Sequence, residues 1–81
     1  MQRFYFFVQE GDTQAEGDAV DLENLEAARK ESVQFAADML AEIDGEVFNK
    51  DWRVRVTNDT GLNLYEIMVV ATIAPAAMKA R

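Results

Sequence analysis

One uninterrupted helical pattern limits the folds that are open to this chain. Between Leu22 and Ile43, apolar side chains recur mostly at intervals of three and four, and neither Gly nor Pro breaks the run. This spacing places them on one face of an α-helix. A helix of about 20 residues is roughly 30 Å long, which is enough to cross a small sheet. The apolar positions are Leu22, Leu25, Ala28, Phe35, Ala36, Met39, Leu40 and Ile43.

Both ends of this predicted helix carry boundary signals. Asn24 and Asp21 are the two candidates for the N-cap, because their side-chain oxygens can accept a hydrogen bond from a free amide of the first turn. Asp44 and Gly45 indicate the other end, since Gly readily takes the left-handed conformation that terminates many helices. We expect this helix to organise the rest of the chain.

The remaining segments alternate as strands do. Residues 3–9 and 52–57 form two such runs, and the turn at residues 58–61 returns the chain along residues 62–71. A short strand around Val20 can pair with the first. We therefore predict an α+β fold, with an antiparallel sheet of three to four strands and one long amphipathic helix on one face, in the order ββαββ. Residues 1–72 are expected to form a single domain and residues 73–81 a C-terminal tail.

The periodicity also predicts a core between helix and sheet. Its expected members are Leu25, Phe35, Met39 and Trp52. One helix covers only one face of a sheet, and the first and last strands have apolar residues on both faces. The second face therefore needs another cover.

Charge and composition exclude several classes of site. The net charge is −7, and the chain contains no Cys and no His, which excludes disulfides and Cys/His zinc sites. The segment from Glu10 to Glu46 holds twelve acidic residues and only two basic ones. The N-terminal segment does not read as a signal peptide, and no apolar run is long enough to span a bilayer. We expect a cytoplasmic protein that does not bind membranes.

Few residues suggest catalysis or metal binding. Ser32 lies within the helix and has no His to activate it. Asp38 and Glu42 lie one turn apart, and acidic residues crowd the connector at Asp12, Glu16, Asp18 and Asp21. Such carboxylates are more often solvated surface groups than cation ligands. We expect no catalytic, cofactor or metal site, and no enzymatic activity.

The sheet face away from the helix is the predicted functional surface. Alternation places Tyr5, Phe7, Arg53, Arg55, Leu64 and Met68 on it. Arg and aromatic residues are typical of protein interfaces, so we expect a homodimer or higher homo-oligomer that associates through this face. Two alternatives remain open. The tail can fold over the face, or the face can bind nucleic acid through stacking and phosphate contacts. The acidic pI of about 4.3 disfavours the nucleic-acid alternative.

The chain also resembles a family of small bacterial proteins known as a domain of unknown function. The resemblance is carried by Arg3-Phe-Tyr-Phe, by Gly11-Asp12, by the run from Val20 to Arg29, and by the segment from Trp52 to Gly61. A His usual near the end of the first strand is Phe7 here, and a Gly usual before Val20 is Ala19. The resemblance implies a fold and no activity.

Overall fold

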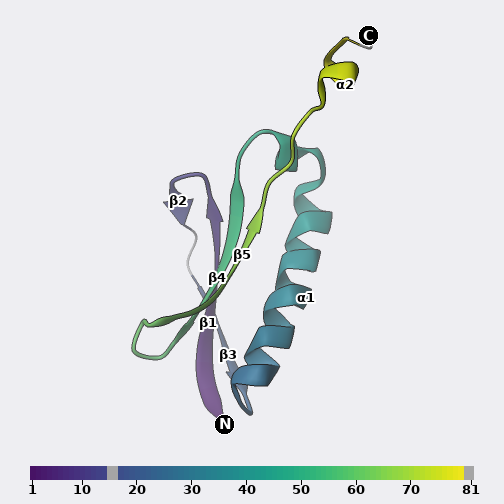
Figure 1. Ribbon diagram of the computed structural model, residues 1–81. Helices are drawn as coiled ribbons and strands as arrows, with labels where there is room; N and C mark the ends of the chain where they lie inside the picture. The colour runs from purple at the N-terminus through teal and green to yellow at the C-terminus, as the bar shows by residue number, and fades with distance from the viewer. Residues whose placement is uncertain (15–16, 80–81) are drawn as a thin grey trace.

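The computed structural model describes residues 1–14 and 17–79. The chain forms, in order, β1 (Gln2–Glu10), β2 (Thr13–Gln14), β3 (Asp18–Leu22), α1 (Leu25–Ile43), the 3₁₀ turn η1 (Asp44–Phe48), β4 (Trp52–Asn58), β5 (Asn63–Val69) and α2 (Pro75–Lys79). This confirms the α+β class and the position of the long helix. Figure 1 shows α1 lying along one face of the twisted sheet.

The sheet is antiparallel and centred on β1 and β4. β1 pairs with β4 on one side, and β2 and β3 share its other side. β4 pairs in turn with β5, which is an edge strand. The expected short strand around Val20 is confirmed, with Val20 opposite Phe4. The two-residue strand β2 was not predicted, because a pair of polar residues carries no alternation.

The helix boundaries follow local chemistry. Asn24 is the N-cap, and its Oδ1 accepts a hydrogen bond from the Ala27 amide at 2.9 Å. Asp21 instead pairs with Arg3. At the other end the residue with a positive φ is Asp44, with φ +50° and ψ −122°, so the expected position of the positive φ at Gly45 was wrong by one residue.

The core joins α1 to the sheet in two clusters. The first contains Phe4, Phe6, Ala28 and Val56, and the second contains Ala36, Met39, Trp52 and Val54. Phe35 packs against both clusters, with its ring centroid 5.5 Å from that of Phe6. The predicted core positions of Phe35, Met39 and Trp52 are therefore correct.

Other parts of the predicted apolar stripe lie outside this core. Leu25 is 48% exposed because it is the first residue of α1, at the corner of the sheet. Leu40 is 42% exposed on the flank of the helix. The position of Leu25 between helix and sheet was therefore wrong. Ser32, which the periodicity skipped, is only 2% exposed, and its Oγ donates a hydrogen bond to the Arg29 carbonyl.

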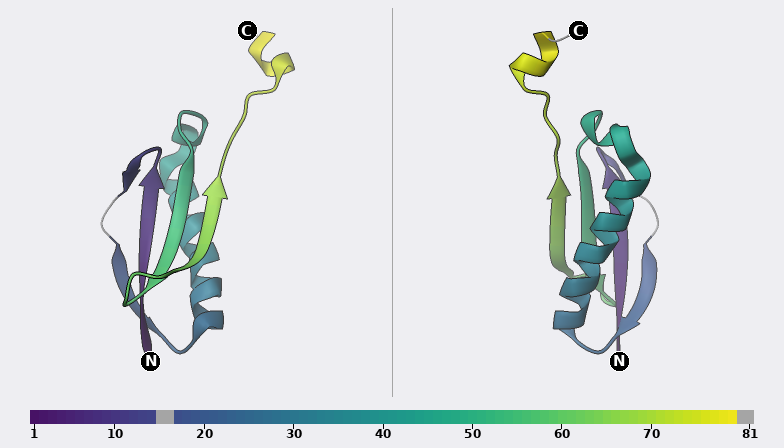
Figure 2. Two further views of the ribbon diagram at one scale, coloured as in Figure 1. Left: turned by 60° about the vertical axis from the view of Figure 1, so that its left-hand side comes forward. Right: turned by 90° about the vertical axis from the view of Figure 1, so that its right-hand side faces the viewer.

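The segment after β5 leaves the body of the molecule. Residues 70–74 run on in extended form and lead into α2, and the described residues extend 52 Å along their longest axis. Figures 1 and 2 show this segment pointing away from both faces of the sheet. In the described residues the tail therefore does not cover the outer face, which contradicts that alternative. Residues 80–81 of the predicted tail lie outside the description.

Replacing Phe35 with Ala tests the junction between the two clusters. Because Phe35 is partly buried, we expect a loss near the lower end of the range for Phe truncation, about 3 kcal/mol. That is a large share of the roughly 4–12 kcal/mol expected for a domain of this size. Chemical denaturation measures it, and Val33→Ala at an exposed position of α1 is the control. An unchanged midpoint would contradict this packing.

A second substitution tests how closely α1 approaches the sheet. Ala28 is fully buried, so Ala28→Met should overpack the junction and destabilise the protein by about 1–3 kcal/mol. Ala37→Met, on the exposed side of the same helix, should change the free energy of unfolding by less than about 0.5 kcal/mol. Equal effects of the two variants would show that the helix does not press on the sheet at Ala28.

Candidate functional site

The sheet face opposite α1, called the outer face below, brings together five of the six predicted interface residues. Phe7 lies opposite Arg55, and Arg53 lies opposite Met68. Tyr5 lies opposite Thr57 in the same register. The alternation of β1 and β4 was therefore sufficient to place these side chains on one surface.

Leu64 does not belong to this surface. The register between β4 and β5 slips after Val56, which pairs with Tyr65, so that Thr57 pairs with Asn63 and Leu64 is the extra residue. A bulge of this kind breaks the strict alternation of faces. Leu64 packs against the inner cluster of Phe4, Phe6, Ala28 and Val56 instead. Its placement on the outer face was wrong for this reason.

The two arginines of the outer face are bound to neighbouring side chains. Arg53 Nε lies 2.9 Å from Glu66 Oε1, and its Nη2 lies 4.0 Å from the sulfur of Met68. Arg55 donates hydrogen bonds to Asn63 Oδ1, at 3.1 Å from Nη2, and to Gln14 Oε1. Glu66 was not predicted as part of this face, although it lies two residues before Met68 on β5 and therefore shares its face. These contacts tie both guanidinium groups to side chains of the same sheet.

Phe7 is covered in part by Gly17, the residue just before β3. A Cβ atom placed on Gly17 would lie 2.6 Å from Cε1 of the Phe7 ring, so the backbone at Gly17 presses directly on this side chain. Phe7 is accordingly only partly exposed. Part of the apolar area that was predicted to need an external cover is thus covered by the chain itself. No local signal in the sequence indicates this contact.

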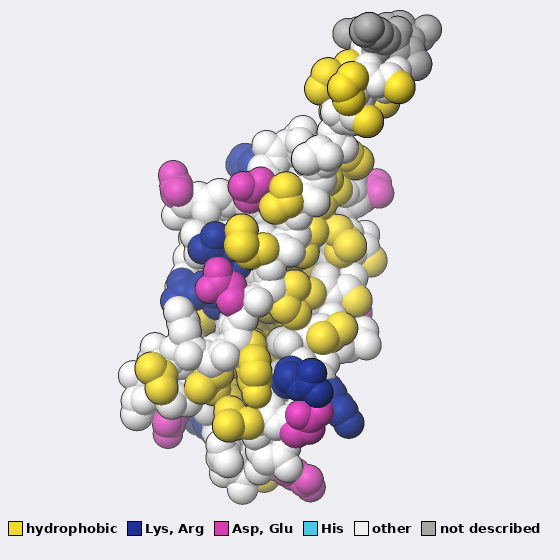
Figure 3. Space-filling model, viewed as in Figure 1, with side chains coloured by type: hydrophobic (Ala, Val, Ile, Leu, Met, Phe, Trp, Pro, Cys, Tyr) yellow, Lys and Arg dark blue, Asp and Glu magenta, His cyan; other side chains and the backbone are white. Residues whose placement is uncertain are grey.

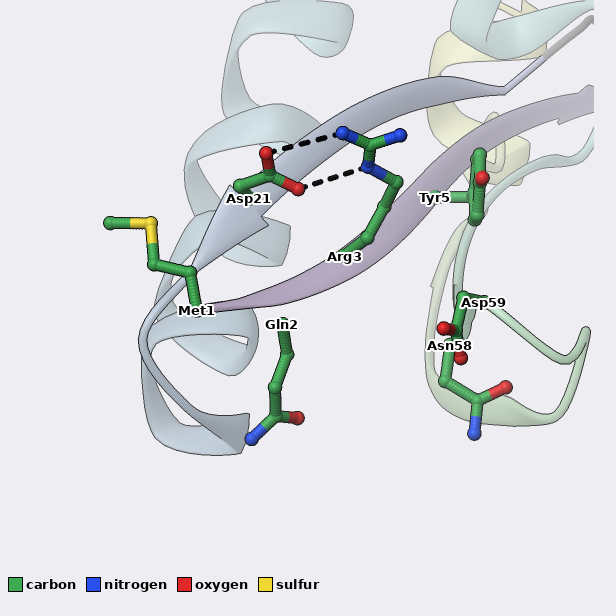
Figure 4. A pocket seen from close by; sticks show the side chains of 7 residues that line it. All are labelled: Met1, Gln2, Arg3, Tyr5, Asp21, Asn58 and Asp59. Atoms are coloured by element: carbon green, nitrogen blue, oxygen red, sulfur yellow. Dashed lines mark hydrogen bonds and ion pairs between the residues drawn. The ribbon is translucent and has the colours of Figure 1, made fainter.

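At the N-terminal end of β1 the outer face opens into a wide hollow of about 730 Å³. Figure 4 shows its lining: Met1, Gln2, Arg3, Tyr5, Asp21, Asn58 and Asp59. Arg3 Nε donates to Asp21 Oδ1 at 3.0 Å. This hydrogen bond lowers the pKa of Asp21 below its ordinary value and raises the pKa of Arg3. Both groups are exposed, so the pair contributes little to stability.

The other polar groups of this hollow already have structural roles. Oδ1 of Asn58 accepts hydrogen bonds from the amides of Thr60 and Leu62 and from the Thr60 hydroxyl. These bonds shape the turn between β4 and β5, in which Gly61 takes a φ of +87°. Within the hollow, the charges of Arg3 and Asp21 are thus paired with each other, and Asn58 Oδ1 is engaged by the turn. These groups are already used in the structure and do not form a ligand site.

The acidic residues considered as cation ligands are dispersed. Within residues 1–14 and 17–79, no three acidic side chains come close enough to hold a metal ion. Asp38 accepts a hydrogen bond from Gln34 Nε2 at 2.9 Å. Glu16, a member of the acidic connector, lies outside the described residues. In the same described ranges no helix has both the length and the apolar character needed to cross a bilayer.

The chain belongs to the family described as "Domain of unknown function (DUF6894)", whose model matches residues 3–71. The match spans the sheet, α1 and the outer face, and it ends just before α2. The resemblance identified from the residues is thereby confirmed. Neither the curated proteins nor the solved structures include a match to this chain.

The contact between Gly17 and Phe7 can be tested by a double-mutant cycle. Gly17→Ala should destabilise the protein by about 1–3 kcal/mol, because the added methyl group overlaps the Phe7 ring. Gly45→Ala is the matched control, since a Cβ there meets nothing within 4 Å. Removing the ring with Phe7→Ala should abolish most of the effect of Gly17→Ala, which denaturation of all four chains measures. Additive effects would contradict the contact.

Proposed function

We propose that this protein is a small non-enzymatic interaction module that self-associates through the outer face of its sheet. The observation that carries the proposal is the exposure of Met68 and Val70, each 55%, on and just after the edge strand β5. Adjacent large apolar side chains exposed on a sheet typically mark a binding surface. α1 lies on the other face of the sheet and the described part of the tail points away from it (Figure 2), which agrees with this exposure.

The surroundings of these two residues fit a protein interface. The guanidinium group of Arg53 contacts the sulfur of Met68 and forms an ion pair with Glu66. A charged pair therefore lies directly beside the exposed apolar side chain. Interfaces are enriched in Met and Arg, and their charged groups lie at the rim. In a two-fold dimer the same patch meets itself, so each Arg53 can exchange its contact with Glu66 for the Glu66 of the other copy.

The polar groups of the outer face support a binding role over a catalytic one. Arg53 and Arg55 are held by neighbouring side chains, and the sequence offers no His or Cys as a nucleophile or proton carrier. Its only serine is buried in α1, where it donates to a backbone carbonyl. A nucleophile needs an adjacent base within hydrogen-bond reach, and within the described part of the chain the hydroxyl of Ser32 bonds to this carbonyl alone.

Nucleic-acid binding is the second candidate, because Tyr5 shares the outer face with Arg53 and Arg55. Stacking on Tyr5 and phosphate contacts from both arginines would have to carry it. We rank it lower because Glu66, Asn63 and Gln14 already occupy the guanidinium groups, and because the net charge of −7 opposes a polyanion.

Sedimentation velocity over a range of concentrations tests the proposal. We expect the wild-type chain to show a concentration-dependent mass above that of the monomer. The double variant Met68→Glu/Val70→Glu should weaken the association at least about tenfold, because it places charges in an apolar contact. Both side chains are exposed in the single chain, so the fold should persist. Val33→Glu, at a similarly exposed apolar position of α1, should associate like the wild type.

Each other outcome of this experiment has a defined meaning. A wild-type chain that stays monomeric at high micromolar concentration would remove self-association altogether. Equal weakening by the Met68→Glu/Val70→Glu and Val33→Glu variants would show that the outer face is not the contact. A salt-sensitive complex with single-stranded RNA, lost in Arg53→Ala/Arg55→Ala, would move nucleic-acid binding to first place.

A further inference from the structure

A second concave surface lies on the opposite side of the sheet, between α1 and β1. It is a groove of about 340 Å³, and its floor is apolar. That volume is at the small end of the range of about 300–1,000 Å³ typical of ligand sites, so it suits a few side chains of a peptide segment. The floor consists of Val8, Phe35, Met39, Ile43 and Trp52.

The strand pairing explains why this groove is open. β3 pairs with β1 only as far as Phe6, and β2 begins its pairing at Gln9. Phe7 and Val8 therefore have no described strand partner on this side of β1. The flank of α1 above the start of β3 is left without a neighbouring strand, and the space between helix and sheet opens there.

The rim of the groove is acidic. Asp18 contributes a carboxylate from the start of β3, and Asp38 and Glu42 contribute two more from successive turns of α1. All three residues are exposed, and none of the described residues that line the groove is basic. An apolar floor with an acidic rim fits a segment that carries large aliphatic side chains next to basic ones.

The chain contains a segment with this chemistry. Residues 71–79, called the arm, carry the exposed apolar side chains of Ile73 and Met78. Figure 3 shows apolar atoms concentrated on the projecting end of the molecule. The sequence has no acidic residue after Glu66, whereas it has Lys79 and Arg81 directly beyond Met78. The arm is thus apolar and basic where the groove is apolar and acidic.

We propose that the groove of one copy binds the arm of a second copy, with Met78 seated on the floor and the basic residues beside it facing the carboxylates. This inference rests on the proposed self-association, but it uses a different surface. The arm leaves from β5, at the opposite edge of the sheet from β2 and β3, and it points away from its own body (Figure 2). This direction favours a groove on another copy over the groove of the same chain.

Trp52 provides a direct reporter of this binding. It is the only tryptophan of the chain, it lines the groove, and it is 8% exposed. We expect its fluorescence to change with protein concentration over the same range in which light scattering shows an increase in mass. Met78→Glu should shift both transitions to at least about tenfold higher concentration. Leu62→Glu, at an exposed position in the turn at the far end of the sheet, is the matched control and should shift neither.

A charge exchange between two chains identifies the groove as the site and a second copy as the occupant. One chain carries Asp38→Lys/Glu42→Lys, and the other carries Lys79→Glu/Arg81→Glu. In each variant alone, the groove and the arm carry charges of the same sign and repel each other. Each variant alone should therefore associate more weakly than the wild type. Mixing the two pairs a basic groove with an acidic arm, so association should return in the mixture. High salt should reduce the difference between the mixture and the separate chains.

The outcomes separate this inference from the proposed function. If Met78→Glu changes Trp52 fluorescence equally at all concentrations while the mass stays monomeric, the arm binds its own groove and the inference is wrong. If the mixture associates no better than its components, the groove does not take a partner's arm. If Met68→Glu/Val70→Glu weakens association while Met78→Glu and the charge exchange have no effect, the outer-face proposal stands and this inference fails.

Discussion

The fold depends on the packing of large sheet side chains against small residues of the helix. Phe4, Phe6 and Val56 meet α1 where it presents Ala28, and Val54 and Trp52 meet it around Ala36 and Met39. Because the side chains of Ala28, Ser32 and Ala36 are short, the helix can lie close to the aromatic rings. A close approach of this kind leaves little room for further large side chains, and Leu25, Leu40 and Met68 are exposed instead.

The two faces of the sheet are consequently covered in different ways. The inner face is covered by α1, whereas the outer face is covered piecewise by interactions of its own. Gly17 presses on Phe7, Glu66 pairs with Arg53, and Asn63 binds Arg55. Among the described residues, the exposed large apolar side chains of this face are those of Met68 and Val70, on and just after the edge strand. The surface available for a partner is therefore displaced toward β5, away from the centre of the sheet.

The sequence was informative wherever one residue's environment is set by its near neighbours. Alternation assigned the faces of β1 and β4, and the cap at Asn24 and the turn at Gly61 follow from side-chain chemistry and backbone freedom. The errors came from features that depend on two segments at once. The bulge that turns Leu64 inward requires the register of β4 against β5, and the contact of Gly17 with Phe7 requires the path of a connector. Ser32 was missed because a buried serine breaks an apolar period without changing the helix.

The uneven charge of the chain restricts how two copies can meet. α1 carries Glu26, Glu31, Asp38 and Glu42 against Arg29 and Lys30, and Arg29 is already paired with Glu26. Two helical flanks brought together would therefore repel each other, and burying their carboxylates without partners would add a desolvation penalty. The sheet face and the arm carry no such excess of acid. This asymmetry would keep the helices of two copies apart. It favours contacts between the acidic helical side of one copy and the basic segment after β5 of another. It does not oppose a contact between the outer faces of two copies.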